Sequence, residues 1–382
     1  MDKRKTLKRV CRDGQAVSCN LPPLPADLLA ATRRTLDNAR QRLLAERTPS
    51  GVWHGELSPS ALSTAVAVFA LDRVNRNTHA PLIRNGLDWL ARHANADGGW
   101  GDTPASPSNL STTLLVWSAL SLDDGSRAAV VKHAEEYIAR AAGSLDPDGI
   151  ARAVLAAYGN DRTFSAPILT LCALAGRLGP EPQVWRRIPQ LPFELAALPH
   201  QTFKWLQLPV VSYAIPALIA IGLVRHRRAE QKKNLWSGVR ERFIPRVLDV
   251  LTRIQPVNGG FLEAAPLTAF VSMSLASSGL ADHVVTQRCA EFLRANVRPD
   301  GSWPIDTNLA TWLTTLSVNA LSSGPDAEPL LTDPDRAAIR AWLLGHQWRA
   351  EHPFTHATPG GWAWTDLKGG VPDADDTSGA LV

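Results

Sequence analysis

Two kinds of apolar segment alternate along this chain. One kind is amphipathic, with apolar residues three or four positions apart, as at Ile83, Leu87 and Leu90. That spacing predicts a helix with one buried face. The other kind carries almost no charge, as in residues 62–71 and 110–120. A helix that is apolar on every side is buried on every side, so these segments predict an inner layer enclosed by the amphipathic helices.

A glycine-rich turn with an aromatic residue joins the two kinds of helix. The turns are Ser50-Gly-Val-Trp53, Asp97-Gly-Gly-Trp100, Asn258-Gly-Gly-Phe261, Asp300-Gly-Ser-Trp303 and Gly360-Gly-Trp362. Glycine adopts the left-handed geometry that ends a helix. The turns recur roughly every 40 to 60 residues, which is the period of stacked helical pairs. The sequence therefore predicts an all-α fold, an α/α barrel of helical repeats, with the turn aromatics packed between repeats.

Composition narrows the classes of function. Hydrophobic residues make up 45% of the 382 residues and charged residues 20%, which is enough apolar material for a full core. The net charge is +4. The sequence has no basic segment interspersed with aromatic residues of the kind that binds nucleic acid, so nucleic acid is not expected as a partner. Cys11, Cys19, Cys172 and Cys289 lack the spacing of disulfide pairs or metal ligands. We interpret them as free thiols in a reducing compartment.

Residues 206–224 form an uncharged stretch that basic residues follow directly, beginning at Arg225. Length and flanking charge fit contact with a membrane. Pro209 and Pro216 count against a span across the bilayer, and the stretch occupies the position of an inner helix in the repeat. Three interpretations stay open: a buried inner helix, a monotopic helix lying in one leaflet, and a transmembrane helix.

An acidic cluster near the end of the chain is the strongest chemical signal. Asp373, Asp375 and Asp376 lie within four positions and follow Trp362-Ala-Trp364. Neighbouring like charges and burial both raise the pKa of a carboxyl, so one of the three is a candidate for an acid that keeps its proton at neutral pH. Such an acid beside an apolar, aromatic-lined cavity can protonate an alkene, and indole rings then stabilise the carbocation.

The cluster admits other interpretations, which its neighbours favour or disfavour. A two-metal prenyl site needs a further carboxylate one helical turn on, and Thr377, Ser378 and Gly379 follow instead. A zinc site needs His or Cys nearby, and a glycosidase needs two separated carboxylates. The acidic residues also suit the start of a helix, where they cap backbone N–H groups.

These residues resemble the class II terpene cyclases, and most closely the bacterial squalene–hopene cyclases. Asp373-Ala-Asp-Asp-Thr377 is similar to the family's D-x-D-D-T signature, and the turns resemble its glutamine–tryptophan repeats. Residues 53–64, Gly98-Gly-Trp-Gly-Asp-Thr103 and 158–164 also carry the resemblance, which covers nearly all of residues 36–382.

The resemblance implies two α/α barrels, of which the acid-bearing one is discontinuous in sequence. Residues 1–35 would belong with the catalytic barrel. Residues 36–300 would form an inserted barrel whose membrane-facing helix lies near 206–224. Residues 301–382 would form the first part of the catalytic barrel, a second and incomplete α/α barrel. The implied location is peripheral, at the cytoplasmic face of a membrane.

The resemblance also implies roles for single residues. Asp375 would donate a proton to a terminal alkene of squalene, while Asp373 and Asp376 hold it in place. The residues implied to contact substrate or stabilise cations are Trp364, Asp306 and Trp362. The implied reaction is cationic cyclisation of squalene to a pentacyclic triterpene, as in hopanoid biosynthesis, with no cofactor and no metal.

Departures from the family pattern keep alternatives open. Ile305 stands where a Trp is expected, and Ala264-Ala265-Pro266 replaces a more polar stretch. Members of the family have roughly another half chain, so a truncated or split enzyme is one expectation. Its partners would be squalene or a similar linear polyprene, membrane lipid, and a C-terminal cyclase half or a second copy of the chain. The alternatives are a non-catalytic helical-repeat protein that binds isoprenoid lipid or a protein, and a protein prenyltransferase β-like subunit.

Overall fold

The computed structural model describes residues 25–159, 161–199, 214–229, 235–322, 330–353 and 355–382. The chain forms two compact units, Met1–Arg47 and Thr48–Val382. In the first unit, helix α2 (Ala26–Ala45) has no buried residue. The second unit contains all the predicted site residues.

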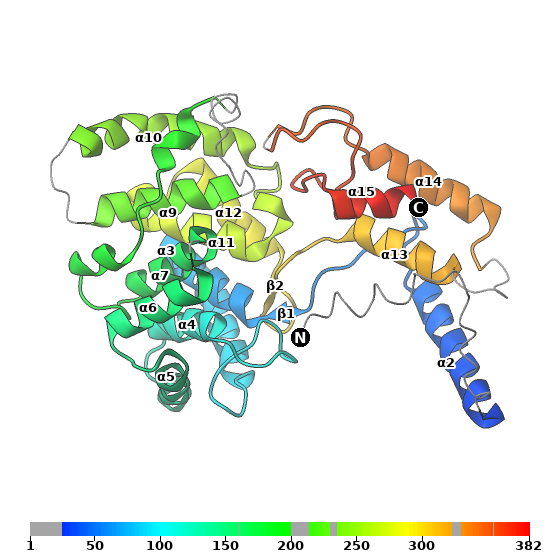
Figure 1. Cartoon of the computed structure of the whole chain (residues 1–382), viewed down its shortest axis with the longest axis horizontal. Helices are drawn as coiled ribbons and strands as arrows, with labels where there is room; N and C mark the ends of the chain where they lie inside the picture. Colours follow the sequence, from blue (N-terminus) through cyan, green and yellow to red (C-terminus); the bar gives the residue numbers. More distant parts are fainter. Residues whose placement is uncertain (1–24, 160, 200–213, 230–234, 323–329, 354) are drawn as a thin grey trace, which may run out of the picture. The chain divides into compact units, whose positions relative to one another are not determined.

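Among the described residues of the second unit, five helices form a closed inner ring (Figure 1). They are α3 (Ala61–Arg92), α4 (Leu110–Ala119), α7 (Arg162–Leu174), α9 (Ile215–Arg228) and α11 (Ala265–Leu275). Each packs against the next, and α11 packs back against α3. The long helix α3 bends at Asn75, whose backbone is not helical, and its nearly continuous buried residues precede that bend. The predicted α/α barrel is confirmed.

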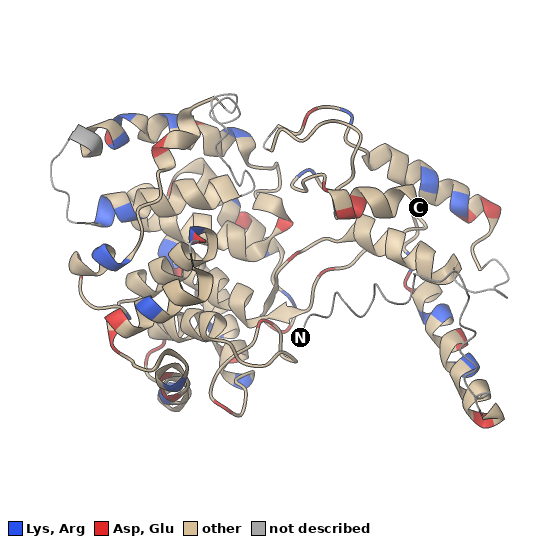
Figure 2. Ribbon diagram, viewed as in Figure 1, with Lys and Arg blue, Asp and Glu red and all other residues tan. Residues whose placement is uncertain are grey.

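Amphipathic helices flank this ring and bury one face each. They are α5 (Ala128–Ala142), α6 (Pro147–Tyr158), α10 (Leu235–Ile254) and α12 (Val284–Ala295). Figure 2 shows charged residues along α10, whereas the inner helix α11 has none. Short helical turns complete the connections: η1 (Leu120–Leu122), η2 (Gln183–Arg187), η3 (Phe193–Ala197), η5 (Phe261–Glu263) and η6 (Ala276–Leu280). The contrast in charge between the layers follows the sequence pattern.

Residues after 305 begin a second set of helix pairs. Helices α13 (Ala310–Ser322), α14 (Asp333–His346) and α15 (Ala374–Leu381) belong to it, and α13 packs against α15. The side chains of Trp312 and Leu316, one turn apart on α13, are 42% and 48% exposed. The second α/α barrel is therefore incomplete within the described residues.

One hydrogen-bonding scheme recurs at the aromatic turns. At the turn before α4, the backbone N–H of Trp100 donates to Oγ1 of Thr113 on the next inner helix, at 3.0 Å. The indole Nε1 of Trp100 donates to the carbonyl of Leu90 at 2.9 Å. Leu90 belongs to the part of α3 after the bend at Asn75, which is amphipathic and serves as the outer helix of this pair. The same two bonds join Trp303 to Thr64 and Leu293, and Trp362 to Thr377 and Leu343. Each Trp therefore ties an outer helix to an inner helix.

The partners are exchanged where the two helix sets meet. The backbone N–H of Trp53 donates to Thr314 on α13, while that of Trp303 donates to Thr64 on α3. Between them, strands β1 (Pro59–Ser60) and β2 (Trp303–Pro304) pair in antiparallel fashion. The turn at Trp303 thus joins the ring, and the turn at Trp53 joins α13. Domain boundaries at residues 35 and 300 stay predictions.

The predicted membrane-facing segment is only partly described, because residues 206–213 lie outside the described residues. The remainder belongs to α9, in which Ile219, Ile221 and Leu223 are fully buried in the barrel. Arg225, at the end of the uncharged stretch, donates to the carbonyl of Ile188. Residues 215–224 therefore form a buried inner helix, which was one of the open interpretations. In the described part of the chain, no helix has the length and apolar character that crossing a bilayer requires.

We predict that replacing Thr64 by Val destabilises the barrel by about 1–3 kcal/mol. Valine has nearly the same shape, but it leaves the buried N–H of Trp303 without an acceptor. The free energy of unfolding in urea measures the loss.

Thr170 provides the matched control. It is also fully buried on an inner helix, and its hydroxyl has no partner among the described residues. Thr170→Val should therefore be neutral or stabilising. Equal losses in the two variants would show that the turn bond contributes nothing.

Candidate active site

The acidic cluster lies on the first turn of α15. Asp373 is the N-cap residue, and its Oδ1 accepts a hydrogen bond from the backbone N–H of Asp376 at 2.8 Å. The backbone N–H of Asp373 donates to the carbonyl of Trp362 at 3.1 Å, in an antiparallel bridge. The helix cap and the acidic cluster are therefore the same structure.

Burial separates the three carboxylates. Asp376 is 7% exposed, whereas Asp373 and Asp375 are exposed. Burial raises the pKa of Asp376 to about 7, helped by the hydrogen bond and charge of Asp373 and by the charge of Asp375. Near neutral pH, a substantial fraction of Asp376 side chains therefore holds a proton.

This distribution differs from the one expected from sequence. The expected donor, Asp375, is the second residue of the helix and points to solvent, while Asp376 is the third and is covered. Side chains at successive helix positions point in directions about 100° apart, so neighbours in a cluster differ in burial. The carboxyl with the raised pKa is thus one residue later than expected. The donor role of Asp375 stays a prediction.

Trp362 lies in a packing position. Its side chain is buried, and its indole Nε1 donates to the carbonyl of Leu343 on α14 at 2.7 Å. Its backbone N–H donates to Oγ1 of Thr377 on α15. These bonds link the acidic helix to α14 through Trp362. The cation-stabilising role predicted for Trp362 stays untested.

Trp364 is held differently. Its backbone carbonyl accepts a hydrogen bond from the N–H of Trp312 at the start of α13. The side chain is partly exposed, and the buried Nε1 has no partner among the described residues. Of the two tryptophans, Trp364 is therefore the one whose ring is not committed to a packing bond.

Asp306 lies on a short segment next to the turn at Phe261. It forms an antiparallel bridge with Ala264, and its carbonyl accepts from the N–H of Leu57 at 3.0 Å. Burial raises the pKa of Asp306 to about 6. The structure thus ties Asp306 to residues 57 and 264.

Sequence reasoning missed a buried carboxyl, that of Glu263. Its side chain is 0% exposed, and burial raises its pKa to about 7. Its Oε1 accepts from the backbone N–H of Gly369, four residues before the acidic cluster, at 3.1 Å. One signal was available, since Glu263 is the only charged residue between Arg253 and Asp282.

Cys172 and Cys289 are buried free thiols, and burial raises the pKa of both. Cys289 accepts a hydrogen bond from Nε2 of Gln255. Among the residues with described positions, no group of three or more His, Cys, Asp or Glu side chains is arranged to hold a metal ion.

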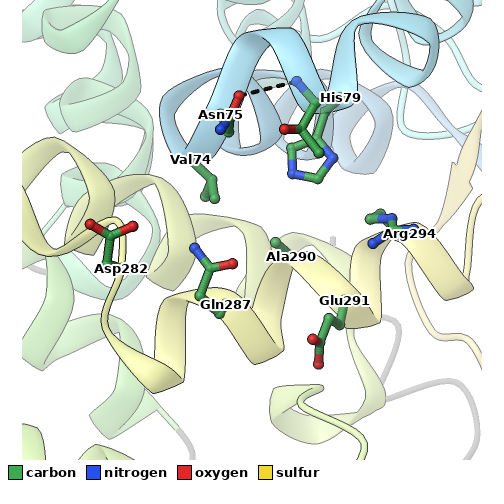
Figure 3. A pocket seen from close by; sticks show the side chains of 9 residues that line it. Val74, Asn75, His79, Asp282, Gln287, Ala290, Glu291 and Arg294 are labelled. Atoms are coloured by element: carbon green, nitrogen blue, oxygen red, sulfur yellow. Dashed lines mark hydrogen bonds between the residues drawn. The ribbon is translucent and has the colours of Figure 1, made fainter.

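A polar pocket of about 280 Å³ lies elsewhere, between α3 and α12 (Figure 3). Its lining includes His79 and Asn75 from α3, and Gln287, Glu291 and Arg294 from α12. Burial and the charge of Arg294 lower the pKa of His79. The pocket contains none of the predicted site residues.

Known proteins match this chain in sequence and in fold. Residues 36–169 match the family model of the squalene-hopene cyclase N-terminal domain. Enfumafungin synthase of Hormonema carpetanum is 25% identical over 93% of this chain, which spans 30% of that protein's length. The structure of abietadiene synthase from Abies grandis superimposes with a TM-score of 0.50 at 16% identity, over 92% of this chain and 40% of that chain.

These matches agree with the resemblance drawn from the Asp cluster and the aromatic turns. At that level of identity, abietadiene synthase supports the helical fold alone. The sequence matches go further: residues 36–169 are similar to the squalene-hopene cyclase N-terminal domain, and most of the chain is similar to a part of enfumafungin synthase.

Proposed function

We propose that this chain supplies the proton-donating part of a class II terpene cyclase that acts on squalene or a similar linear polyprene. The observation that carries the proposal is the first turn of α15. There a capped cluster of three carboxylates includes one, Asp376, that is buried and has a pKa raised to about 7. Its product would be a pentacyclic triterpene of the hopanoid type.

The three carboxylates divide the work by their exposure. Asp375 is the exposed member next to the buried one, so a polyprene that covers the turn reaches Asp375 first. Such a ligand displaces water from around the three carboxyl groups. Asp376 keeps a proton in the cluster between turnovers.

The reaction itself transfers one proton. The O–H bond of the carboxyl breaks, the π electrons of the terminal alkene form a C–H bond, and a tertiary carbocation remains. The next double bonds attack in sequence, and loss of a proton or capture of water ends the cascade. The ring of Trp364 is suited to stabilise a cation, because its indole is not engaged in a packing bond.

We also propose peripheral contact with the cytoplasmic face of a membrane, where the polyprene dissolves. The uncharged residues 206–213 and the overall positive charge support this proposal.

A second candidate function is binding without catalysis. The exposed side chains of Trp312 and Leu316 on α13, which packs against α15, favour it. An apolar surface of this kind suits an isoprenoid chain or a partner protein.

We predict that Asp375→Asn lowers the formation of cyclic product from squalene by at least about 100-fold, because the general acid is removed. Purified protein is incubated with squalene, and the extract is analysed by gas chromatography and mass spectrometry. Asp146→Asn is the matched control. Asp146 caps α6, one of the helices that flank the inner ring, and its replacement should leave product formation unchanged.

Two outcomes would change the assignment. Equal product from Asp375→Asn and wild type would reject Asp375 as the donor. If wild-type protein retains squalene without converting it, and Trp312→Ala abolishes retention, binding without catalysis is the function.

We further predict that wild-type stability falls as the pH rises, and that Asp376→Asn reduces this fall. An aspartate in the unfolded chain has a pKa of 3.8, whereas the pKa of Asp376 in the folded protein is about 7. Its stabilising contribution is therefore complete below about pH 4 and is lost as the pH rises to about 7, by up to about 4 kcal/mol. Differential scanning calorimetry between pH 4.5 and pH 8 measures the effect. Part of the fall should persist, because Glu263 and Asp306 also have raised pKa values. An unaltered pH dependence in the variant would contradict the burial of Asp376.

A further inference from the structure

The acidic cluster is reached through a loop that carries Trp364. This loop, residues 363–372, is named the Trp364 loop here. Its ends are joined, because the backbone N–H of Asp373 donates to the carbonyl of Trp362. The geometry of Asp373, and with it the start of α15, therefore depends on how the loop is held.

Two side chains form hydrogen bonds to the Trp364 loop near its C-terminal end, at Gly369 and Gly370. Oε1 of Glu263 accepts from the N–H of Gly369 at 3.1 Å. Nε2 of the buried His352 donates to the carbonyl of Gly370 at 3.1 Å, while its Nδ1 accepts from the N–H of Thr355. The approach of Glu263 is close: a Cβ added at Gly369 would lie 2.2 Å from Oε1. The Gly369 position therefore has room only for glycine when Glu263 is in place.

Glu263 is itself firmly fixed. Its Oε2 accepts from Nδ2 of Asn258 at 2.7 Å, and its backbone carbonyl accepts from both the N–H and the hydroxyl of Thr307. Leu262 and Glu263 have φ values of 57° and 53°, in the left-handed region that residues other than glycine seldom adopt. Two such residues in succession strain the backbone, and they persist only where surrounding contacts determine the conformation.

We propose that Glu263 is a positioning residue that anchors the Trp364 loop and thereby holds the acidic cluster in its capped, buried arrangement. The inference rests on the proposed function for its catalytic meaning. The anchor crosses between chain segments: Glu263 follows the turn at Phe261, which belongs to the ring, whereas Gly369 leads into α15. The carboxylate of Glu263 thus connects the ring with the segment that leads to the acid.

The charge state of Glu263 sets the strength of this anchor. Burial raises its pKa to about 7, the hydrogen bonds from Asn258 and Gly369 oppose that shift, and the charge of Asp366 on the loop adds to it. Two further titratable groups lie near this anchor. Asp306 lies on the segment that pairs with Ala264, and the neutral His352 donates to the carbonyl of Gly370. A carboxylate accepts a stronger hydrogen bond than a carboxylic acid does, so the anchor tightens as the pH rises through about 7.

The amide of Gly369 reports this titration without any need for activity. In protein labelled with ¹³C-carbonyl lysine and ¹⁵N-glycine, its signal is assigned without a variant, because Lys368-Gly369 is the one Lys-Gly pair in the sequence. We expect the wild-type shift to move between pH 5 and pH 9 with a midpoint near 7. The movement should vanish in Glu263→Gln, and its midpoint should shift to lower pH in Asp366→Asn. The control is the signal of Gly238, where a Cβ would meet no atom within 4 Å; that signal should not change with pH. A midpoint that persists in Glu263→Gln would overturn the anchor.

The positioning role has its own test. In Glu263→Gly the carboxyl is gone, while glycine adopts the positive φ of this position without strain. We expect the carboxyl midpoint of Asp376, followed by ¹³C resonance, to fall toward its ordinary value as water enters, and kcat with squalene to fall at least tenfold with KM little changed. Glu263→Gln keeps an acceptor for Gly369 and should restore both. An Asp376 midpoint that is the same in Glu263→Gly and wild type would refute positioning. Absence of product from wild-type protein, with the midpoint shift intact, would instead refute the proposed function alone.

Discussion

The fold depends on satisfying the buried backbone N–H of each turn aromatic. An inner helix lined by apolar residues offers few acceptors, and a threonine hydroxyl near its start is the one that recurs. The hydroxyl bonds the turn from the next helix, and the indole N–H bonds the helix before it. Since an unpaired buried amide costs more than the bond returns, Trp and Thr are specified together. The repeat is therefore defined by these hydrogen bonds as much as by its hydrophobic pattern.

The same constraint creates the acidic site. Thr377 is the threonine of the last turn, and it follows Asp376 directly. The bond between Trp362 and Thr377 draws the first turn of α15 against its neighbours, so that one carboxyl is covered while the helix N-terminus stays capped by another. A structural turn found at Trp100 and Trp303 becomes a chemical site at Trp362 because Asp residues occupy the helix start.

The layers, the repeat and the acidic cluster could be predicted from the sequence, because local periodicity or short motifs indicate each of them. The sequence was insufficient for the burial of single carboxylates. Asp375 and Asp376 are adjacent and chemically identical, and their difference comes from what lies over each helix position. Glu263 was missed because its partner, Gly369, is more than a hundred residues away and has no side chain. For residues 215–224, the lack of charge fits lipid and protein interior equally, and only the ring contacts of α9 distinguish the two.

The exchange of turn partners has a consequence for how the chain folds. The bond from Trp303 to Thr64 spans 239 residues, and that from Trp53 to Thr314 spans 261. Contacts of such long range form late, since the loop they close loses much conformational entropy. A ribosome must therefore release residue 303 before the turn at Trp303 can bond to Thr64, whereas α11 can pack against α3 as soon as residue 275 is free. The β1–β2 pairing lies between the two bonds and joins the same two segments of the chain. Ring and acid-bearing helices are in this sense one cooperative unit.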